Sequence, residues 1–246
     1  MNTKLLIAFA VAGLAGTAHA QSAFEGFYGQ IATGYESNSI GDLNQNYTYR
    51  QISGRTGDGT TKASNQTASG VPLVFGLGYN FKINDSWLIG LGVDYSALSQ
   101  VDTSPYSSPD SNGNRTNGMK LTVQDRYNIF LSPAFVIDKD KLAYFKVGYS
   151  AQTVKFLTPA QNTSPTAYSP AMTTSNNTNG YILGLGYKQM ISGSFYGFAE
   201  VNYMKYTKGD TNIGSSAVAS NGTSFTTSTD YGASTYTLLV GVGYRF

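Results

Sequence analysis

The chain has 246 residues, with 16 Lys and Arg against 14 Asp and Glu, a net charge of +2, and only 12% charged residues. This near balance argues against nucleic acid as a partner, because nucleic-acid-binding proteins present strongly basic surfaces. The absence of Cys excludes disulfides and thiolate metal sites.

The first twenty residues have the pattern of a secretory signal peptide. Lys4 precedes an apolar run from Leu5 to Leu14, and the segment ends in Ala18-His19-Ala20, a cleavage site of the A-x-A type. A buried N-terminal helix is the alternative, but nothing after Gln21 continues a helical pattern. We expect residues 1–20 to be removed, which takes away the charge of Lys4 and leaves one domain, residues 21–246, with a net charge of +1.

Beyond the signal peptide, apolar residues alternate with small or polar ones. Every second residue from Val71 to Phe81 is apolar, which predicts a strand with one apolar face. No run of 18 apolar residues occurs, so helical membrane spans are excluded. The alternation appears in eight segments, residues 27–35, 71–81, 87–95, 127–137, 143–151, 181–187, 195–203 and 236–246.

The predicted strands have about the 9–11 residues that a tilted strand needs to cross a bilayer. Short connections at Ile83–Ser86, Asp138–Lys141 and Ser192–Gly193 alternate with long ones at residues 37–70, 99–118, 157–178 and 207–233. The pattern predicts an all-β protein: an eight-stranded antiparallel up-and-down transmembrane β-barrel with short periplasmic turns and four long extracellular loops. A soluble ligand-binding barrel is the alternative.

Aromatic residues gather at both ends of the outward faces, where a membrane barrel carries girdles. The predicted outer girdle contains Tyr35, Tyr95, Tyr127, Tyr181, Tyr203 and Tyr236, and the periplasmic girdle contains Trp87 with Phe27, Tyr79, Phe81, Phe135, Phe195, Tyr244 and Phe246. The high strand propensity of aromatics alone would scatter them along the strands and over both faces. The strand centres are instead mostly Ile, Leu, Val, Ala or Gly.

Three motifs resemble a known family: the opening Phe24-Glu25-Gly26-Phe27-Tyr28-Gly29, the repeated Gly-x-Gly blocks, and the terminal Gly243-Tyr244-Arg245-Phe246. They are similar to small outer-membrane barrels, which include the OmpA-type transmembrane domain, opacity proteins and related surface antigens. The resemblance implies export to the outer membrane, a bilayer with lipopolysaccharide around the barrel, and an assembly machinery that recognises Tyr244 and Phe246. A peptidoglycan-binding domain follows the barrel in full-length OmpA-type proteins, but this chain ends at Phe246, so no cell-wall anchoring is expected.

No motif in the chain indicates catalysis or a cofactor. The Gly-x-Gly blocks lack the third glycine and the following helix of a nucleotide fingerprint, so we assign them a packing role inside the barrel. His19, the one histidine, leaves with the signal peptide, so a Ser-His-Asp or Cys-His site and His-ligated zinc are excluded. We expect no enzyme, metal or cofactor, with a histidine-free lipid-modifying enzyme as the alternative.

Charged residues also occur at positions that face the lumen. Asp94, Arg126, Lys146 and Glu200 form the predicted central network, with Asp94 and Arg126 as the expected pair, and Glu36, Lys82, Lys188 and Arg245 also point inward. Buried charges are costly unless they are paired, so both signs together predict ion pairs that plug the barrel. This favours a structural or surface-interaction protein whose loops contact host molecules, lipopolysaccharide or other cells. A narrow pore for ions or very small solutes is the alternative.

Overall fold

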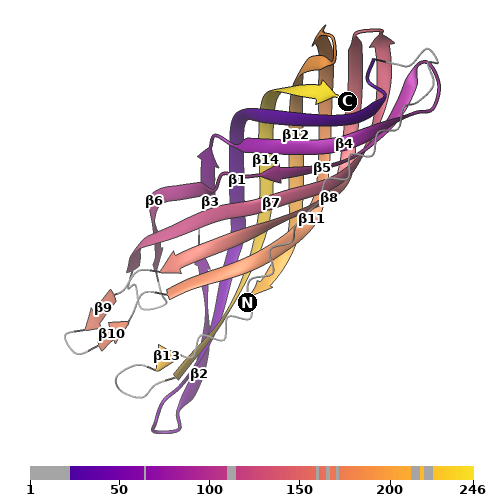
Figure 1. Cartoon of the computed structure of the whole chain (residues 1–246). Coiled ribbons are helices and arrows are strands. Elements are labelled where there is room, and N and C mark those ends of the chain that lie inside the picture. The colour runs from indigo at the N-terminus through magenta and orange to yellow at the C-terminus, as the bar shows by residue number, and fades with distance from the viewer. Residues whose placement is uncertain are drawn as a thin grey trace, which may run out of the picture.

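The chain closes into one ring of antiparallel strands (Figure 1). The computed structural model describes residues 23–63, 65–109, 115–158, 161–164, 167–169, 172–211, 217–218 and 224–246, so the predicted signal peptide lies outside it. The ring consists of β1 (Gly26–Arg50), β4 (Leu73–Lys82), β5 (Trp87–Ser96), β7 (Arg115–Asp138), β8 (Lys141–Thr158), β11 (Met172–Ser192), β12 (Phe195–Thr211) and β14 (Ser224–Arg245). Neighbours in this order are paired, and β14 pairs with β1. The predicted eight-stranded barrel is confirmed.

Among the described residues, no helix has the length and apolar character required to span a membrane.

The strands are staggered around the ring. From Tyr28, the path of paired inward residues passes through Gly78, Gly92, Phe130, Gly148, Ile182, Met204 and Thr235 and returns to β1 at Asn38. The return point lies ten residues beyond the start (38 − 28 = 10), which is the shear of the barrel. Such a shear tilts the strands by roughly 35–45° from the barrel axis. Residues that pair across a ladder therefore lie at different depths in the membrane.

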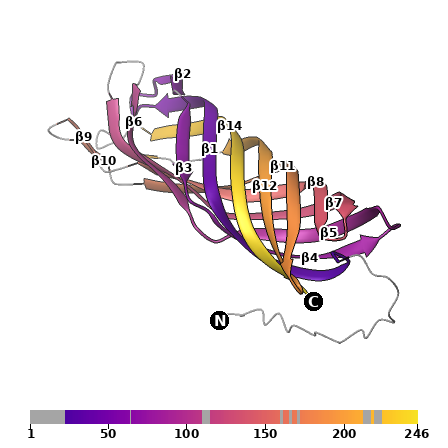
Figure 2. The ribbon, with the colours of Figure 1, turned by 90° about the horizontal axis from the view of Figure 1, so that it is seen from above.

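Several strands are much longer than the sequence predicted. β1 has 25 residues, β7 has 24 and β14 has 22, whereas a tilted crossing needs about 9–11. The segments predicted as long loops contain these extensions and the short strands β2 (Thr56–Ala63), β3 (Gln66–Gly70), β6 (Gln100–Pro109), β9 (Gln161–Ser164), β10 (Ala167–Ser169) and β13 (Ala217–Val218). They project from the end of the barrel opposite the C-terminus (Figures 1 and 2). The predicted strand ends were wrong because these segments have no apolar alternation, although Thr and Tyr favour strands.

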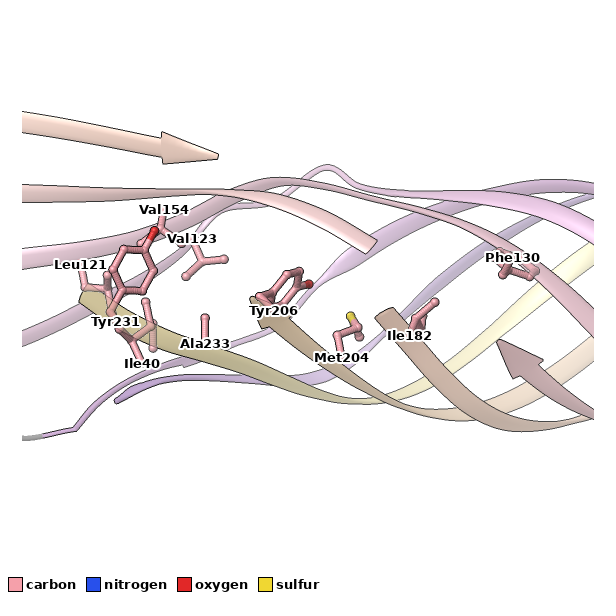
Figure 3. Close-up of a cluster of buried hydrophobic side chains, with 11 residues drawn as sticks. Ile40, Leu121, Val123, Phe130, Val154, Ile182, Met204, Tyr206, Tyr231 and Ala233 are labelled. Carbon is pink, nitrogen blue, oxygen red and sulfur yellow. The ribbon is translucent and has the colours of Figure 1, made fainter. Parts of the chain in front are cut away.

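Apolar side chains fill both ends of the lumen. Toward the strand extensions, a cluster that includes Ile40, Val154, Met204 and Tyr206 lies inside the wall (Figure 3). A second cluster near the short turns includes Phe24, Leu88, Leu142, Tyr144 and Tyr196. Between them lie the charged residues of the lumen.

A β-bulge in β7 allows the apolar cluster near the strand extensions to form. Asp125 has a φ of 52°, and the pairing with β8 shifts between Gln124 and Tyr127. Arg126 points inward on one side of the bulge, and Val123 points inward on the other, although they are three positions apart, an odd spacing that would place them on opposite faces of a regular strand. The inserted residue changes the inward parity of the strand, as bulges do. The sequence pattern did not predict this change.

Two of the short turns carry exposed ion pairs. Lys82 Nζ lies 2.8 Å from Asp85 Oδ1, and Lys141 Nζ lies 2.8 Å from Asp138 Oδ2. A hydrogen bond from Lys82, together with its charge, holds the pKa of the Asp85 carboxyl below its usual value. Lys82 therefore pairs with Asp85 at a turn and lies away from the central charges of the lumen.

Candidate functional site

The lumen contains two separate charge clusters. In the one nearer the turns, Lys146 of β8 binds two carboxylates, with Nζ 2.8 Å from Asp94 Oδ2 and 2.7 Å from Glu200 Oε1. Glu200 also accepts hydrogen bonds from the Tyr144 hydroxyl and from Asn202 Nδ2. The ammonium lies 4.1 Å from the centre of the Phe130 ring. All these side chains are buried, so each charge depends on its partners in the cluster.

The second cluster surrounds Arg126 and lies nearer the strand extensions. Arg126 binds Glu36 of β1 through both terminal nitrogens, with Nη2 3.0 Å from Oε1. Its Nε donates to Gln152 Oε1 at 3.1 Å, and Nη2 also donates to Asn38 Oδ1. Thr235 Oγ1 donates to the same Asn38 oxygen at 2.7 Å. The guanidinium of this β7 residue is therefore held by side chains of two other strands, β1 and β8, and Thr235 of β14 supports Asn38.

The predicted Asp94–Arg126 pair is wrong. Asp94 pairs with Asn128 in the β5–β7 ladder, and Arg126 pairs with Ser96, so both charged side chains start from adjacent positions on one wall. Side chains stand roughly perpendicular to the strands, and long ones reach the opposite wall of a narrow barrel. Arg126 therefore meets Glu36, and Asp94 meets Lys146. The structure places three of the four predicted network residues together and Arg126 in a separate cluster.

Two further inward charges lie near the turn end. Lys188 is buried and donates to Gln30 Oε1 at 3.3 Å. Arg245 donates to the backbone oxygen of Glu25 at 3.4 Å. Glu36 and Lys188 were predicted only as inward charges, and inward parity by itself does not distinguish them from Arg245.

The lumen contains a small cavity beside its charged residues. A cavity of about 10 Å³ lies between Lys146, Lys188, Glu200 and the aromatic residues beside them, which is room for about one water molecule. In the part of the chain that the structure describes, no group of three His, Cys, Asp or Glu residues could hold a metal ion. The arrangement can neutralise buried charge and seal the barrel.

The residues of the predicted outer girdle lie on the outside of the wall. Tyr35, Tyr95, Tyr127, Tyr181 and Tyr236 are 45–58% exposed, and Tyr203 packs on Tyr236 with ring centres 4.8 Å apart. Tyr149, which was not among the predicted girdle residues, is also exposed, and its ring lies 6.3 Å from the Tyr127 ring. Tyr149 has the parity of the outward residues in the predicted strand 143–151, and this position could have identified it as a girdle residue.

At the turn end, aromatic rings contact one another around the barrel. The centres lie 4.7 Å apart for Phe27 and Tyr79, 4.5 Å for Tyr79 and Phe81, 5.2 Å for Trp87 and Phe135, 4.9 Å for Phe195 and Tyr244, and 5.1 Å for Tyr244 and Phe246. The backbone N–H of Phe246 donates to the oxygen of Phe27 at 2.9 Å, at the seam where β14 meets β1. The terminal aromatic residue is thus part of this ring.

A family model matches almost the whole chain. Residues 6–246 match the family model described as "Outer membrane protein beta-barrel domain". No curated protein matches the chain. Similar solved structures include the attachment invasion locus protein Ail of Yersinia pestis (17% identity, TM-score 0.40, covering 90% of this chain and 99% of that one). OprG from Pseudomonas aeruginosa is also similar, with 17% identity and a TM-score of 0.45 over 90% of this chain and 96% of that one. Neisserial surface protein A has 12% identity and a TM-score of 0.42 over 87% of this chain and 99% of that one.

Proposed function

This chain belongs to the family of outer membrane protein β-barrel domains, and we propose that it acts as a structural and surface-interaction protein through its extracellular end. The short turns then face the periplasm, and the strand extensions project from the cell. The partners are lipopolysaccharide around the barrel and host molecules or other cells at its tip.

The length of the strand extensions carries this proposal. The β1–β14 ladder runs from Tyr28, opposite Arg245, to Arg50, opposite Ser224, with one shift between Gly41 and Asn44. Since a tilted crossing uses only about 9–11 residues, roughly half of this ladder lies beyond the membrane. Paired strands hold a surface in one shape, so the protein presents a preformed contact surface.

The filled lumen supports an anchoring role for the barrel. Arg126 and Lys146 bind carboxylates within it, and apolar clusters close it on both sides. The cavity beside Lys146 and Lys188 has room for about one water molecule, so it is too small for a hydrated solute. The expected loss of His19 with the signal peptide leaves no base for a hydrolytic site of the usual kind. Both the pore and the enzyme are therefore disfavoured.

A deletion of the tallest extension tests the proposal. Ile40 pairs with Gln66 in the β1–β3 ladder. Residues 42–64 can therefore be replaced by a two-residue turn that joins Gly41 to Asn65. The paired strands between this turn and the membrane are preserved. Bacteria that produce the full chain should adhere to epithelial monolayers or to one another, and bacteria with the deletion should not. A control with two Gly residues inserted in the turn Ile83–Ser86 should adhere normally.

Equal adhesion at equal outer-membrane levels would contradict the proposal. Planar-bilayer recording of the unmutated protein should show no stable conductance; a stable one would establish the pore instead. Incubation with phospholipid and lipid A should leave their masses unchanged, whereas a mass change would reveal an enzyme.

A further inference from the structure

Lys188 of β11 lies in an aromatic cage in the turn-side half of the lumen. Its Nζ is 4.0 Å from the centre of the Tyr28 ring, 4.8 Å from that of Tyr196 and 5.3 Å from that of Tyr144. Its hydrogen bond to Gln30 Oε1 is 3.3 Å long. Among the described residues, no carboxylate lies within 4.0 Å of this nitrogen. The ammonium is thus stabilised by ring faces rather than by a direct ion pair.

The cage is built into the wall by three cross-strand pairs of the same kind. Each tyrosine stands opposite a glycine on the neighbouring strand: Tyr28 opposite Gly78, Tyr144 opposite Gly186, and Tyr196 opposite Gly243. A Cβ atom on these glycines would lie 2.5, 2.1 and 2.2 Å from the facing tyrosine. The missing side chains leave room for the three rings, and the Lys188 ammonium lies over each of them.

Charge balance shows why a cation belongs there. Asp94 and Glu200 both bind Lys146, so one positive charge serves two carboxylates. The ammonium of Lys188 brings the four buried charges to a net charge of zero, although it touches neither carboxylate. Without it, the group of Lys146, Asp94 and Glu200 would carry a net charge of −1, which favours entry of a cation.

The turn-side mouth above the cage is closed by the segment before β1. The Phe24 ring lies 6.3 Å from the Tyr196 ring, and Asn80 Nδ2 donates to the Phe24 oxygen at 2.7 Å. Asn80, which holds Phe24, also lines the small cavity beside Lys188, Tyr28 and Tyr144. A small ion that passes Phe24 would therefore meet the cage first.

We propose that the Tyr28–Tyr144–Tyr196 cage is a binding site for a primary ammonium group and that Lys188 is its tethered occupant. In the intact protein, Lys188 excludes free cations from the turn-side half of the lumen. Removal of its side chain beyond Cβ opens a space with the shape of n-propylammonium, CH3CH2CH2NH3⁺. The site then takes this ion from solution.

The cage is tested first in the unmutated protein in detergent micelles. Three aromatic faces around Nζ should shift the Lys188 ε-methylene protons upfield by ring currents. Lys139, which is 89% exposed in the Asp138–Lys141 turn, is the internal reference. An ε-methylene shift of Lys188 equal to that of Lys139 would overturn the cage, whatever the behaviour of any variant.

The occupant is tested with Lys188→Ala by chemical rescue. n-Propylammonium chloride should raise the urea midpoint of this variant, or its refolding yield if it folds poorly, in a saturable manner. Sodium chloride and n-propanol at the same concentration should not, and neither the unmutated protein nor Lys139→Ala should respond. A response to n-propanol equal to that of the ammonium would show filling of an apolar hole only. No response to any of the three would equally overturn the proposal.

Discussion

Arg126 of β7 and Glu36 of β1 join opposite walls of the barrel, with Nη2 3.0 Å from Oε1 and both side chains buried. The two residues are 90 positions apart in the chain and three strands apart around the ring. Their contact exists only when the ring is closed.

We expect strong coupling between Arg126 and Glu36. Arg126→Ala should lower the free energy of unfolding by about 3–5 kcal/mol, because Glu36 remains as an unpaired buried charge. The double variant with Glu36→Ala should lose less than the sum of the single losses. Urea unfolding in detergent or lipid bilayers measures the cycle. Asp94→Ala with Arg126→Ala is the matched control and should be nearly additive; the reverse pattern would contradict the observed pairing.

Lys146 should be the most sensitive charge in its cluster. Lys146→Met leaves two buried carboxylates, Asp94 and Glu200, without their shared cation, so its loss of unfolding free energy should exceed that of Asp94→Asn. Glu200→Gln added to Lys146→Met should recover part of the loss, because one of the two negative charges is removed. The same unfolding assay measures both effects. A further loss in the double variant would show that the carboxylates do not repel each other.

The bulge at Asp125 should tolerate glycine better than a β-branched residue. Its φ of 52° lies in the left-handed region, which glycine adopts freely and valine avoids. We expect Asp125→Gly to keep or slightly raise the urea midpoint and Asp125→Val to cost about 1–3 kcal/mol. Thr122→Val, in the regular part of β7, is the control for the added valine. Equal midpoints for the two Asp125 variants would mean that the bulge does not require this conformation.

Trp87 should report the periplasmic interface of the bilayer. Its side chain is exposed on the outside of the wall and packs on Phe135. In bilayers, quenchers placed near the headgroups should reduce its fluorescence more than quenchers at mid-membrane. Stronger quenching by aqueous iodide than by headgroup-level quenchers would place it outside the girdle.

Phe246 should affect assembly more than final stability. Its ring is 72% exposed at the turn end and contacts the ring of Tyr244, so its deletion removes at most about 2–3 kcal/mol of apolar burial. If Tyr244 and Phe246 act as an assembly signal, the deletion of Phe246 should lower the amount of this protein in the outer membrane of cells. The purified variant should still refold in detergent. Phe195→Ala, which removes a neighbouring girdle ring, is the control. Unchanged levels in cells would leave Phe246 as an ordinary girdle residue.

The wall of the barrel could be predicted from the sequence because lipid and lumen impose a local rule on every strand. The alternation from Val71 to Phe81 already separates an outward apolar face from an inward one, and each predicted segment overlaps a wall strand. The same parity identified Asp94, Arg126, Lys146 and Glu200 as inward charges before any partner was known.

The partners of those charges depend on the closed ring, because the shear and the reach of each side chain decide which groups meet. The alternation within one strand does not reveal the ten-residue stagger of the ring, which brings Arg126 to Glu36. It also does not reveal the bulge at Asp125, which turns Val123 inward. The cage around Lys188 likewise needs tyrosines from β1, β8 and β12, each opposite a glycine of another strand. Such contacts join residues that are distant in the chain, and only the tertiary structure brings them together.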